Sequence, residues 1–217
     1  DFRVSNPPSN PQLLDALGAK LVEYKFDLRQ LVRDICNSYT YQQSTRPRDP
    51  NVVDDRNFSH ALVRRLGAEA LLDAISQVTE TKVKFPSLPL GARAVQVAAG
   101  NSGNYFLDLF GRPPRESVCA CERRNDPTLA QALHLINGDT VQQAITAADG
   151  RLEKRLAAET PTPEIVQELY LAAFSRPPTE EEKTTLEQYV TAATDRRLAL
   201  QDVYWSVLNA KEFVFNH

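Results

Sequence analysis

Apolar residues recur at helical spacing in several separate stretches of this chain, and that spacing restricts the fold more than any other feature. The stretches near residues 28–36 and 200–208 place apolar residues at i, i+3, i+4, i+7 and i+8. Residues 63–78 and 186–193 carry similar stripes. Because a helix of 3.6 residues per turn brings such positions to one face, each stretch predicts a helix that packs against a core. The chain is therefore expected to be all-α.

Start signals for helices agree with these stripes. Asn10, Asp126 and Thr162 each precede a proline, which is typical of an N-cap followed by the first helical residue. Ser59 is a candidate N-cap, and Thr179 with Glu182 forms a capping box. About ten helices follow from these signals: 11–24, 27–39, 59–79, 103–110, 127–137, 139–147, 150–159, 163–175, 179–194 and 197–211.

Two long connections separate the predicted helices. They cover residues 40–57 and 80–102, and the alternation of Val95 with Val97 allows one short strand in the second. The expected fold is an orthogonal or bundle-like array of helices with long loops and at most one short strand or hairpin. We expect residues 1–217 to form one helical domain, with 1–79 and 103–217 as possible halves that pack together.

The charge balance excludes some classes of partner. The 217 residues carry a net charge of -3, and basic pairs stand beside acidic residues. A concentrated basic surface for nucleic acid or anionic membrane is therefore not expected. No apolar run approaches the roughly 20 residues that a membrane-spanning helix needs, so we expect no membrane insertion by this segment.

Two segments of the chain resemble each other. Residues 106–116 read FLDLFGRPPRE and residues 170–180 read YLAAFSRPPTE, so that Arg112 and Arg176 occupy the same place. The echo is typical of repeated helical hairpins, but helix-ending chemistry alone can also produce it. In either case we expect Arg112 and Arg176 to be structural anchors that bind nearby carbonyls or carboxylates.

The loop at residues 110–124 concentrates arginines, glutamates and thiols, and it holds the candidate site. Cys119 and Cys121 are compatible with ordinary thiols, with a disulfide, or with a metal clip completed by Cys36 or histidines. Glu122, Arg123 and Arg124 are candidates for ligand binding beside these thiols. Thiol redox chemistry is a further possibility for the two cysteines.

Complete catalytic signatures are missing from the sequence. The histidines lack the H-E-x-x-H spacing of a metalloprotease, and no C-x-x-C-H motif for haem attachment is present. The sequence therefore assigns no catalytic residue and leaves open whether the protein is an enzyme, although it favours a non-enzyme; we expect no metal site of recognised type and no cofactor in this chain.

Seven ordered blocks carry a resemblance to one family. They begin with NPPSNPQLLDAL at 6–17 and include FGRPPRESVCACER at 110–123 and LNAKEFVFNH at 208–217. Together they resemble the domain of unknown function 1553, a planctomycete-type domain found near the C-terminus of large proteins with upstream cytochrome c domains. Cys119, Cys121, Glu122 and Arg123 match the C-x-C-E-R pattern of the family, which brings no established role with it.

The resemblance implies a setting for the chain. It suggests an exported, extracytoplasmic protein, periplasmic or at the cell surface, from which an N-terminal helical piece is absent here. Haem is expected only on an upstream domain. Our leading hypothesis is a non-catalytic interaction or scaffolding module whose partners are those upstream domains or other extracytoplasmic proteins. The alternative is an enzyme or a metal or ligand site at the C-x-C-E-R loop, acting in polysaccharide processing.

Overall fold

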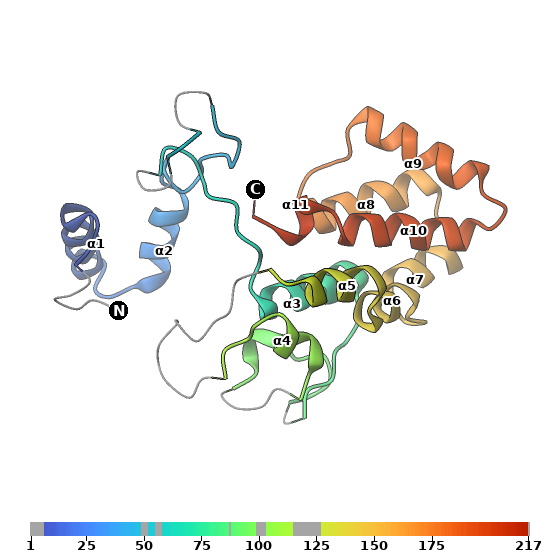
Figure 1. Ribbon diagram of the computed structural model, residues 1–217, viewed down its shortest axis with the longest axis horizontal. Coiled ribbons are helices and arrows are strands. Elements are labelled where there is room, and N and C mark those ends of the chain that lie inside the picture. The colour runs from blue at the N-terminus through green and yellow to red at the C-terminus, as the bar shows by residue number, and fades with distance from the viewer. Residues whose placement is uncertain are drawn as a thin grey trace. The chain divides into compact units, whose positions relative to one another are not determined.

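The protein is built from helices and loops. The computed structural model describes residues 7–48, 52–54, 58–86, 88–98, 103–114 and 127–216. Its helices are α1 (Pro11–Glu23), α2 (Leu28–Cys36), α3 (Ala68–Thr79), the 3-10 helix η2 (Ala94–Gln96), α4 (Tyr105–Leu109), α5 (Leu129–Asn137), α6 (Asp139–Thr146), α7 (Arg151–Ala157), α8 (Thr162–Phe174), α9 (Glu180–Ala192), α10 (Arg196–Leu208) and α11 (Lys211–Val214) (Figure 1).

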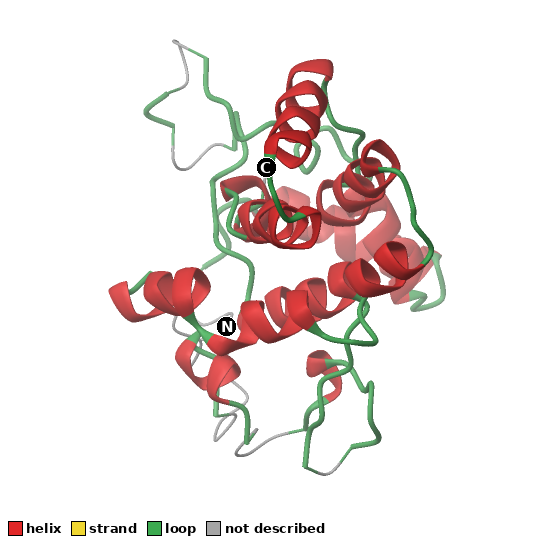
Figure 2. Ribbon diagram, turned by 90° about the vertical axis from the view of Figure 1, so that its right-hand side faces the viewer, coloured by secondary structure: helices red, strands yellow, loops and turns green. Residues whose placement is uncertain are grey.

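The all-α class predicted from the sequence is confirmed. Figure 2 shows helices and connecting loops, and within the described ranges the extended pairing is an isolated bridge between Arg65 and Phe215. Each predicted helix has a counterpart in the structure, although several boundaries differ.

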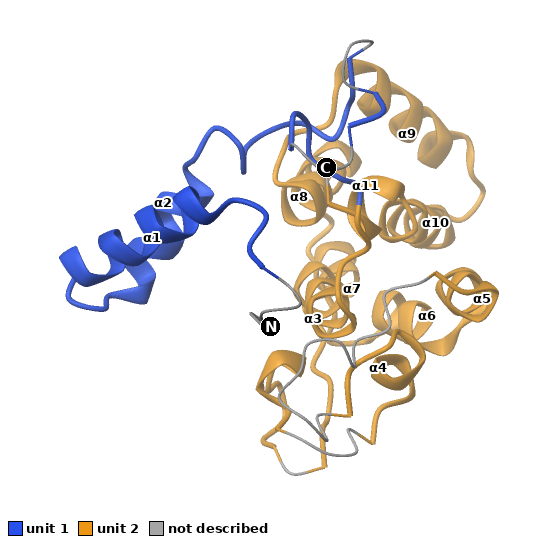
Figure 3. Cartoon of the chain, turned by 60° about the vertical axis from the view of Figure 1, so that its left-hand side comes forward, with its two compact units in different colours: residues 1–63, 217 blue, residues 64–216 orange. Residues whose placement is uncertain are grey.

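The chain divides into two compact units (Figure 3). Unit 1 comprises residues 1–63 with residue 217, and unit 2 comprises residues 64–216. The single domain over 1–217 and its halves 1–79 and 103–217 stay predictions. Helix α3 lies in unit 2 and packs there against α4, α6 and α8.

Unit 1 contains a hairpin of two capped helices. The Asn10 side chain accepts a hydrogen bond from the backbone N–H of Leu13 at 3.0 Å, as its N-cap position predicts. Lys25 and Phe26 adopt positive φ angles of 52° and 65° in the turn between α1 and α2. No residue of α1 or α2 is buried. The two helices therefore form secondary structure without contributing a buried core of their own.

Unit 2 holds the hydrophobic core. Helix α10 packs against α6, α8 and α9, and α3 packs against α8. The predicted stripe of α10 is buried along its whole length, since Leu200, Val203, Tyr204, Val207 and Leu208 are at most 3% exposed. Full burial of each such apolar side chain contributes about 1.5–3 kcal/mol to folding. The burial of this stripe holds α10 against its neighbouring helices in the core of unit 2.

Helix α3 begins later than the sequence suggested. The predicted helix 59–79 is wrong over its first part, because α3 starts at Ala68 after Gly67 as N-cap rather than after Ser59. The backbone before Gly67 pairs instead with the end of the chain: the Leu66 N–H donates to the Val214 carbonyl at 2.9 Å, and the Asn216 N–H donates to that of Arg64 at 2.9 Å. Long-range backbone pairing thus takes the place of helical turns that the apolar stripe alone favoured.

The segment around Val95 also differs from expectation. Instead of a short strand, Ala94–Gln96 forms the 3-10 helix η2. The Asp73 carboxylate of α3 accepts hydrogen bonds from the N–H groups of Ala94 at 2.6 Å and Val95 at 3.4 Å. These bonds satisfy backbone donors that a strand would have paired with a neighbouring strand.

Other boundaries also need correction; α2, for example, ends at Cys36 rather than at residue 39. Helix α5 has Thr128 as its N-cap, not Asp126, which lies outside the described residues. Thr162 is the first residue of α8 rather than its cap. The predicted helix 197–211 stops at Leu208, and a separate short helix, α11, follows. The capping box of Thr179 with Glu182 is confirmed at the start of α9.

Candidate functional site

The strongest sequence candidates fall outside the part of the chain that the structure describes. Cys119, Cys121, Glu122, Arg123 and Arg124 belong to residues 115–126, which are not among the described ones. Their proposed binding, redox or metal chemistry stays a prediction.

The other two candidates, Arg112 and Arg176, follow helix ends of the same shape. Gly111, after α4, has a φ angle of 79°, and Ser175, after α8, has a φ angle of 57°, so both adopt the left-handed conformation. That conformation turns the chain out of a helix and is the usual C-terminal signal. The two segments that are similar in sequence are therefore also similar in backbone conformation at this position.

Aromatic pairs precede both helix ends. The rings of Phe106 and Phe110 stack with centroids 4.1 Å apart, and those of Tyr170 and Phe174 meet edge to face at 5.1 Å. Each pair is spaced four residues apart and so lies on one helix face. The two helix ends thus share the aromatic pair, the left-handed residue and the following arginine.

The two arginines nevertheless bind different groups. Arg112 is 7% exposed, and its Nη2 donates to the carbonyl oxygens of Val97 at 3.1 Å and Ala98 at 2.5 Å. It therefore joins the end of α4 to the backbone that follows η2. A guanidinium that binds backbone carbonyls in this way is placed as an anchor would be.

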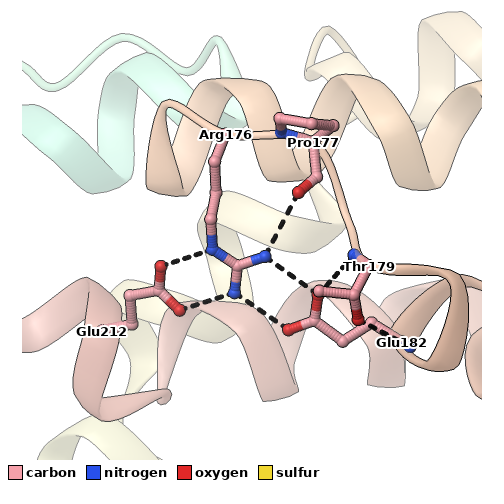
Figure 4. A network of polar contacts seen from close by, with 5 residues as sticks. All are labelled: Arg176, Pro177, Thr179, Glu182 and Glu212. Carbon is pink, nitrogen blue, oxygen red and sulfur yellow. Dashed lines mark hydrogen bonds and ion pairs between the residues drawn. The ribbon is translucent and has the colours of Figure 1, made fainter.

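Arg176 lies between two carboxylates (Figure 4). Its Nε and Nη2 donate to Glu212 of α11 at 2.7 and 2.8 Å, and its Nη1 and Nη2 donate to Glu182 of α9 at 2.9 Å each. Nη1 also donates to the Pro177 carbonyl at 3.2 Å. A guanidinium has five N–H donors, so these five bonds use all of them and leave no donor for a ligand.

Aromatic faces complete the surroundings of Arg176. The guanidinium carbon lies 5.4 Å from the ring centroids of both Tyr170 and Phe174. At the α4 end a different residue takes this position: Arg65 lies 5.2 Å from the Phe110 ring and donates to the Phe110 carbonyl at 3.0 Å. At the α4 end, therefore, Arg65 makes the contact with the aromatic ring and Arg112 binds backbone carbonyls, whereas after α8 Arg176 makes both its aromatic and its polar contacts alone.

Charge pairing fixes the protonation of the Arg176 network. The hydrogen bonds from Arg176 lower the pKa of Glu182 to about 2. The same two carboxylates raise the pKa of Arg176 above its usual range. Glu182 and Arg176 therefore stay charged at physiological pH, and the network suits a structural clamp better than proton transfer.

Among the histidines, His134 is a packing residue. Its ring lies 5.4, 5.8 and 6.3 Å from the rings of Tyr105, Phe106 and Phe110, and its Nε2 is 3.0 Å from the Thr140 hydroxyl. Burial lowers the pKa of His134, so the imidazole is neutral near pH 7.

Soft ligands do not gather in the described parts of the chain. Cys36 forms no disulfide with any described residue, and no group of three His, Cys, Asp or Glu side chains there is arranged to hold a metal ion.

Sequence reasoning missed two features of unit 2. One is Glu212, the second carboxylate of the Arg176 network, which no local motif connects to Arg176. The other is a pocket of about 420 Å³ between α3, residues 81–84 with Leu90, and α6, called here the lysine pocket because Lys82 and Lys84 line it. Lys82 and Lys84 are two residues apart on the segment that follows α3, and this spacing matches no known binding motif.

Comparison with known proteins identifies the family. The sequence profile described as PSD1, a protein of unknown function (DUF1553), matches residues 1–190. The chain belongs to the DUF1553 family. No curated protein and no solved structure matches the chain of this DUF1553 member. Among its described residues, no helix combines the length and apolar character that crossing a membrane requires.

Proposed function

We propose that this DUF1553 domain is a non-catalytic interaction module of a larger exported protein linked to cytochrome c electron transfer, in the periplasm or at the cell surface. In this proposal any haem is carried by other domains, and the α1–α2 hairpin provides the docking surface. The observation that supports the proposal is the exposure of large apolar side chains along this hairpin.

The exposed residues lie in the turn and on α2. Phe26, Leu28 and Val32 are 70%, 64% and 56% exposed, and we call them the hairpin residues. Leu28 and Val32 are four residues apart and so share one face of α2. Single exposed apolar residues are ordinary on protein surfaces, but several on one short hairpin are typical of an interaction site.

The hairpin residues are not explained by packing within the hairpin itself. Contacts between α1 and α2 include a hydrogen bond from the Tyr24 hydroxyl to the Asp34 carboxylate at 2.5 Å, but no residue of either helix is buried. Covering one hairpin residue with a partner would contribute about 1.5–3 kcal/mol. Docking would thus supply stabilisation that the hairpin does not obtain from its own packing.

The partner that fits best is an apolar groove on the domains that precede this one in the parent protein. An amphipathic helix that binds through residues at i and i+4 is a common recognition mode, and the stripe of α2 has that form. The mixed charges of the hairpin give no reason to expect an anionic polymer instead.

Titration calorimetry of the chain with the purified preceding domains tests the proposal. We expect saturable binding, and we expect Leu28→Glu and Val32→Glu each to weaken it at least tenfold, since each would bury a charge at the interface. Glutamate is tolerated at the start of a helix and has a higher helix propensity than valine, so both variants should fold.

Gln30→Glu is the matched control, because it adds the same charge to α2 two residues away from either position. It should bind like the unaltered chain. Absence of binding to the preceding domains, or equal weakening by all three variants, would overturn the proposal.

A further inference from the structure

We propose that the lysine pocket of unit 2 binds a small organic monocarboxylate with a compact apolar body. This inference is independent of the hairpin and concerns a different unit of the chain. The pocket's volume of about 420 Å³ lies within the range usual for small-molecule sites.

The deep part of the pocket is apolar. Leu72 and Ile75 of α3 are each 1% exposed, and Ala144 of α6 is 9% exposed. Leu90 and Val83 add apolar surface from the connecting segment. A ligand that enters this pocket therefore gains by placing an apolar group against these side chains.

The outer part of the pocket carries an excess of positive charge. Lys82 and Lys84 line it together with one carboxylate, that of Asp149. The Lys84 ammonium donates to the Leu88 carbonyl at 2.9 Å, so one of its three donors is already used. Lys82 makes no ion pair with any residue that the structure describes. The two ammonium groups and the one carboxylate leave a net charge of +1 at the pocket, which matches a ligand with one negative charge.

Neutral donors lie on the same pocket. Ser76 of α3 and Gln143 of α6 line it with a hydroxyl and an amide, while the Thr140 hydroxyl is engaged with His134. A carboxylate accepts hydrogen bonds from such donors at the same time as it pairs with an ammonium. The arrangement favours a carboxylate over an amine, which Lys82 would repel.

The wall that carries the lysines is built before any ligand arrives. Phe85 is 1% exposed and fixes the segment to the core, and the Leu88 N–H donates to the Phe85 carbonyl at 3.3 Å. Gly91, with a φ angle of 86°, donates to the Val83 carbonyl at 3.4 Å and turns the chain back past Lys82. A pre-formed site of this kind loses little conformational entropy when a ligand binds.

Benzoate is a suitable probe, because it combines one carboxylate with a compact ring. Titration of the whole chain, followed by two-dimensional amide NMR, should give saturable shifts at Ser76, Lys82 and Gln143. Benzamide and benzylamine have the same ring without the negative charge, and we expect neither to saturate the site at concentrations that saturate it with benzoate.

Two variants locate the site. Lys82→Gln should weaken benzoate binding about tenfold through loss of a charge-assisted hydrogen bond. Ser76→Leu should abolish binding by filling the pocket from α3, and the spectrum of the variant reports whether it folds. The matched control Lys211→Gln removes an exposed lysine that does not line the pocket, so binding should be unchanged.

Several results would overturn the proposal. Binding of benzamide as tight as that of benzoate would mean that charge does not select the ligand. Competition by inorganic phosphate at equal concentration would indicate a phosphate site instead. Equal weakening of benzoate binding by Lys82→Gln and Lys211→Gln would show that the overall charge of the protein, and not Lys82 in the pocket, determines the affinity.

Discussion

Arg176 and Glu212 face each other through two parallel hydrogen bonds, from Nε to Oε1 at 2.7 Å and from Nη2 to Oε2 at 2.8 Å. Arg176 follows α8 and Glu212 lies on α11, so the pair fastens the end of the chain to a helix end that precedes it by 36 positions. The opposite edge of the same guanidinium binds Glu182 at the start of α9. One side chain thus sets the relative positions of three helices.

Arg176→Ala should lower the free energy of unfolding by about 2 kcal/mol. It removes two bidentate pairs and the contacts with the Tyr170 and Phe174 rings, and it leaves two carboxylates near each other. Solvent screening limits this loss, because the Arg176 side chain is 34% exposed. Urea denaturation followed by circular dichroism measures the change.

Arg197→Ala is the control for a single exposed ion pair. Arg197 is 58% exposed and pairs with Glu153 at 3.1 Å, so its loss should cost less than about 1 kcal/mol. Equal costs for the two variants would show that the paired geometry of Arg176 adds nothing. Full stability of Arg176→Lys would show that the charge suffices without the fork of the guanidinium.

The Arg176 network should also make stability depend on pH in the acid range. The pKa of Glu182 is about 2 in the folded protein, against 4.5 for a free glutamate. Because the folded value is the lower one, the stabilisation is fully present above pH 4.5 and is lost as the pH falls towards 2. With partial exposure of the carboxylate taken into account, we expect about 1–2 kcal/mol to disappear across this window.

Urea denaturation at a series of pH values between 6 and 2 tests this expectation. Glu182→Gln should flatten the acid slope, because the amide still accepts hydrogen bonds but does not titrate in this range. Glu181→Gln changes the adjacent, exposed residue and should keep the slope. If both variants flatten it alike, the slope does not come from the Arg176 network.

The helices of this protein could be predicted because their signals are local. Thr179 and Glu182 are three residues apart, and that spacing alone predicted the start of α9. The stripe of α10 likewise predicted which of its residues would be buried. Such signals depend on the period of the helix and on capping chemistry, both of which can be read from a short stretch of sequence.

The errors arose where a distant segment supplied the partner. Leu66 belongs to an apolar stripe that favours helix, but its N–H pairs with the carbonyl of Val214, far along the chain. Glu212 could not be assigned to Arg176 for the same reason. In the lysine pocket, Ser76 and Gln143 come from separate helices whose meeting depends on the fold. Local sequence carries no information on such pairings.

Tyr204→Phe should leave stability unchanged or raise it by up to about 1 kcal/mol. Tyr204 is 1% exposed, and its hydroxyl finds no hydrogen-bond partner in the described part of the chain. A buried hydroxyl without a partner loses its hydrogen bonds to water and gains none in the protein. Removing the hydroxyl therefore takes away an unfavourable contribution to the free energy of folding. Tyr189→Phe is the contrast: its exposed hydroxyl donates to Asp202 at 2.7 Å, so a small loss is expected.

Alkaline pH provides a second measurement on Tyr204. Burial raises the pKa of Tyr204 to about 12 from an ordinary value of 10. Since the folded value is the higher one, the unfolded chain loses this proton first, and the free energy of unfolding declines as the pH rises from 10 towards 12. Tyr204→Phe should reduce the decline of stability over this range. A clear loss of stability at neutral pH would mean that the hydroxyl has a partner after all.

Two glycines should respond to alanine in opposite directions. Gly18 lies inside α1 with no other group within 4 Å of an added methyl, so Gly18→Ala should stabilise the helix by about 0.5–1 kcal/mol. Gly138 lies between α5 and α6 with an ordinary φ angle of -79°, but an added Cβ would overlap the His134 carbonyl and ring. Gly138→Ala should therefore cost about 2–4 kcal/mol through displacement of backbone.

Hydrogen exchange distinguishes these effects, because it reports each helix separately. Gly18→Ala should slow exchange in α1 alone, whereas Gly138→Ala should speed exchange in α5 and α6. The double variant that combines His134→Ala with Gly138→Ala should recover only part of the stability that Gly138→Ala loses. The side chain of residue 134 is then removed, but its backbone carbonyl remains in place. Wild-type stability of Gly138→Ala would contradict the close approach of α5 to the start of α6.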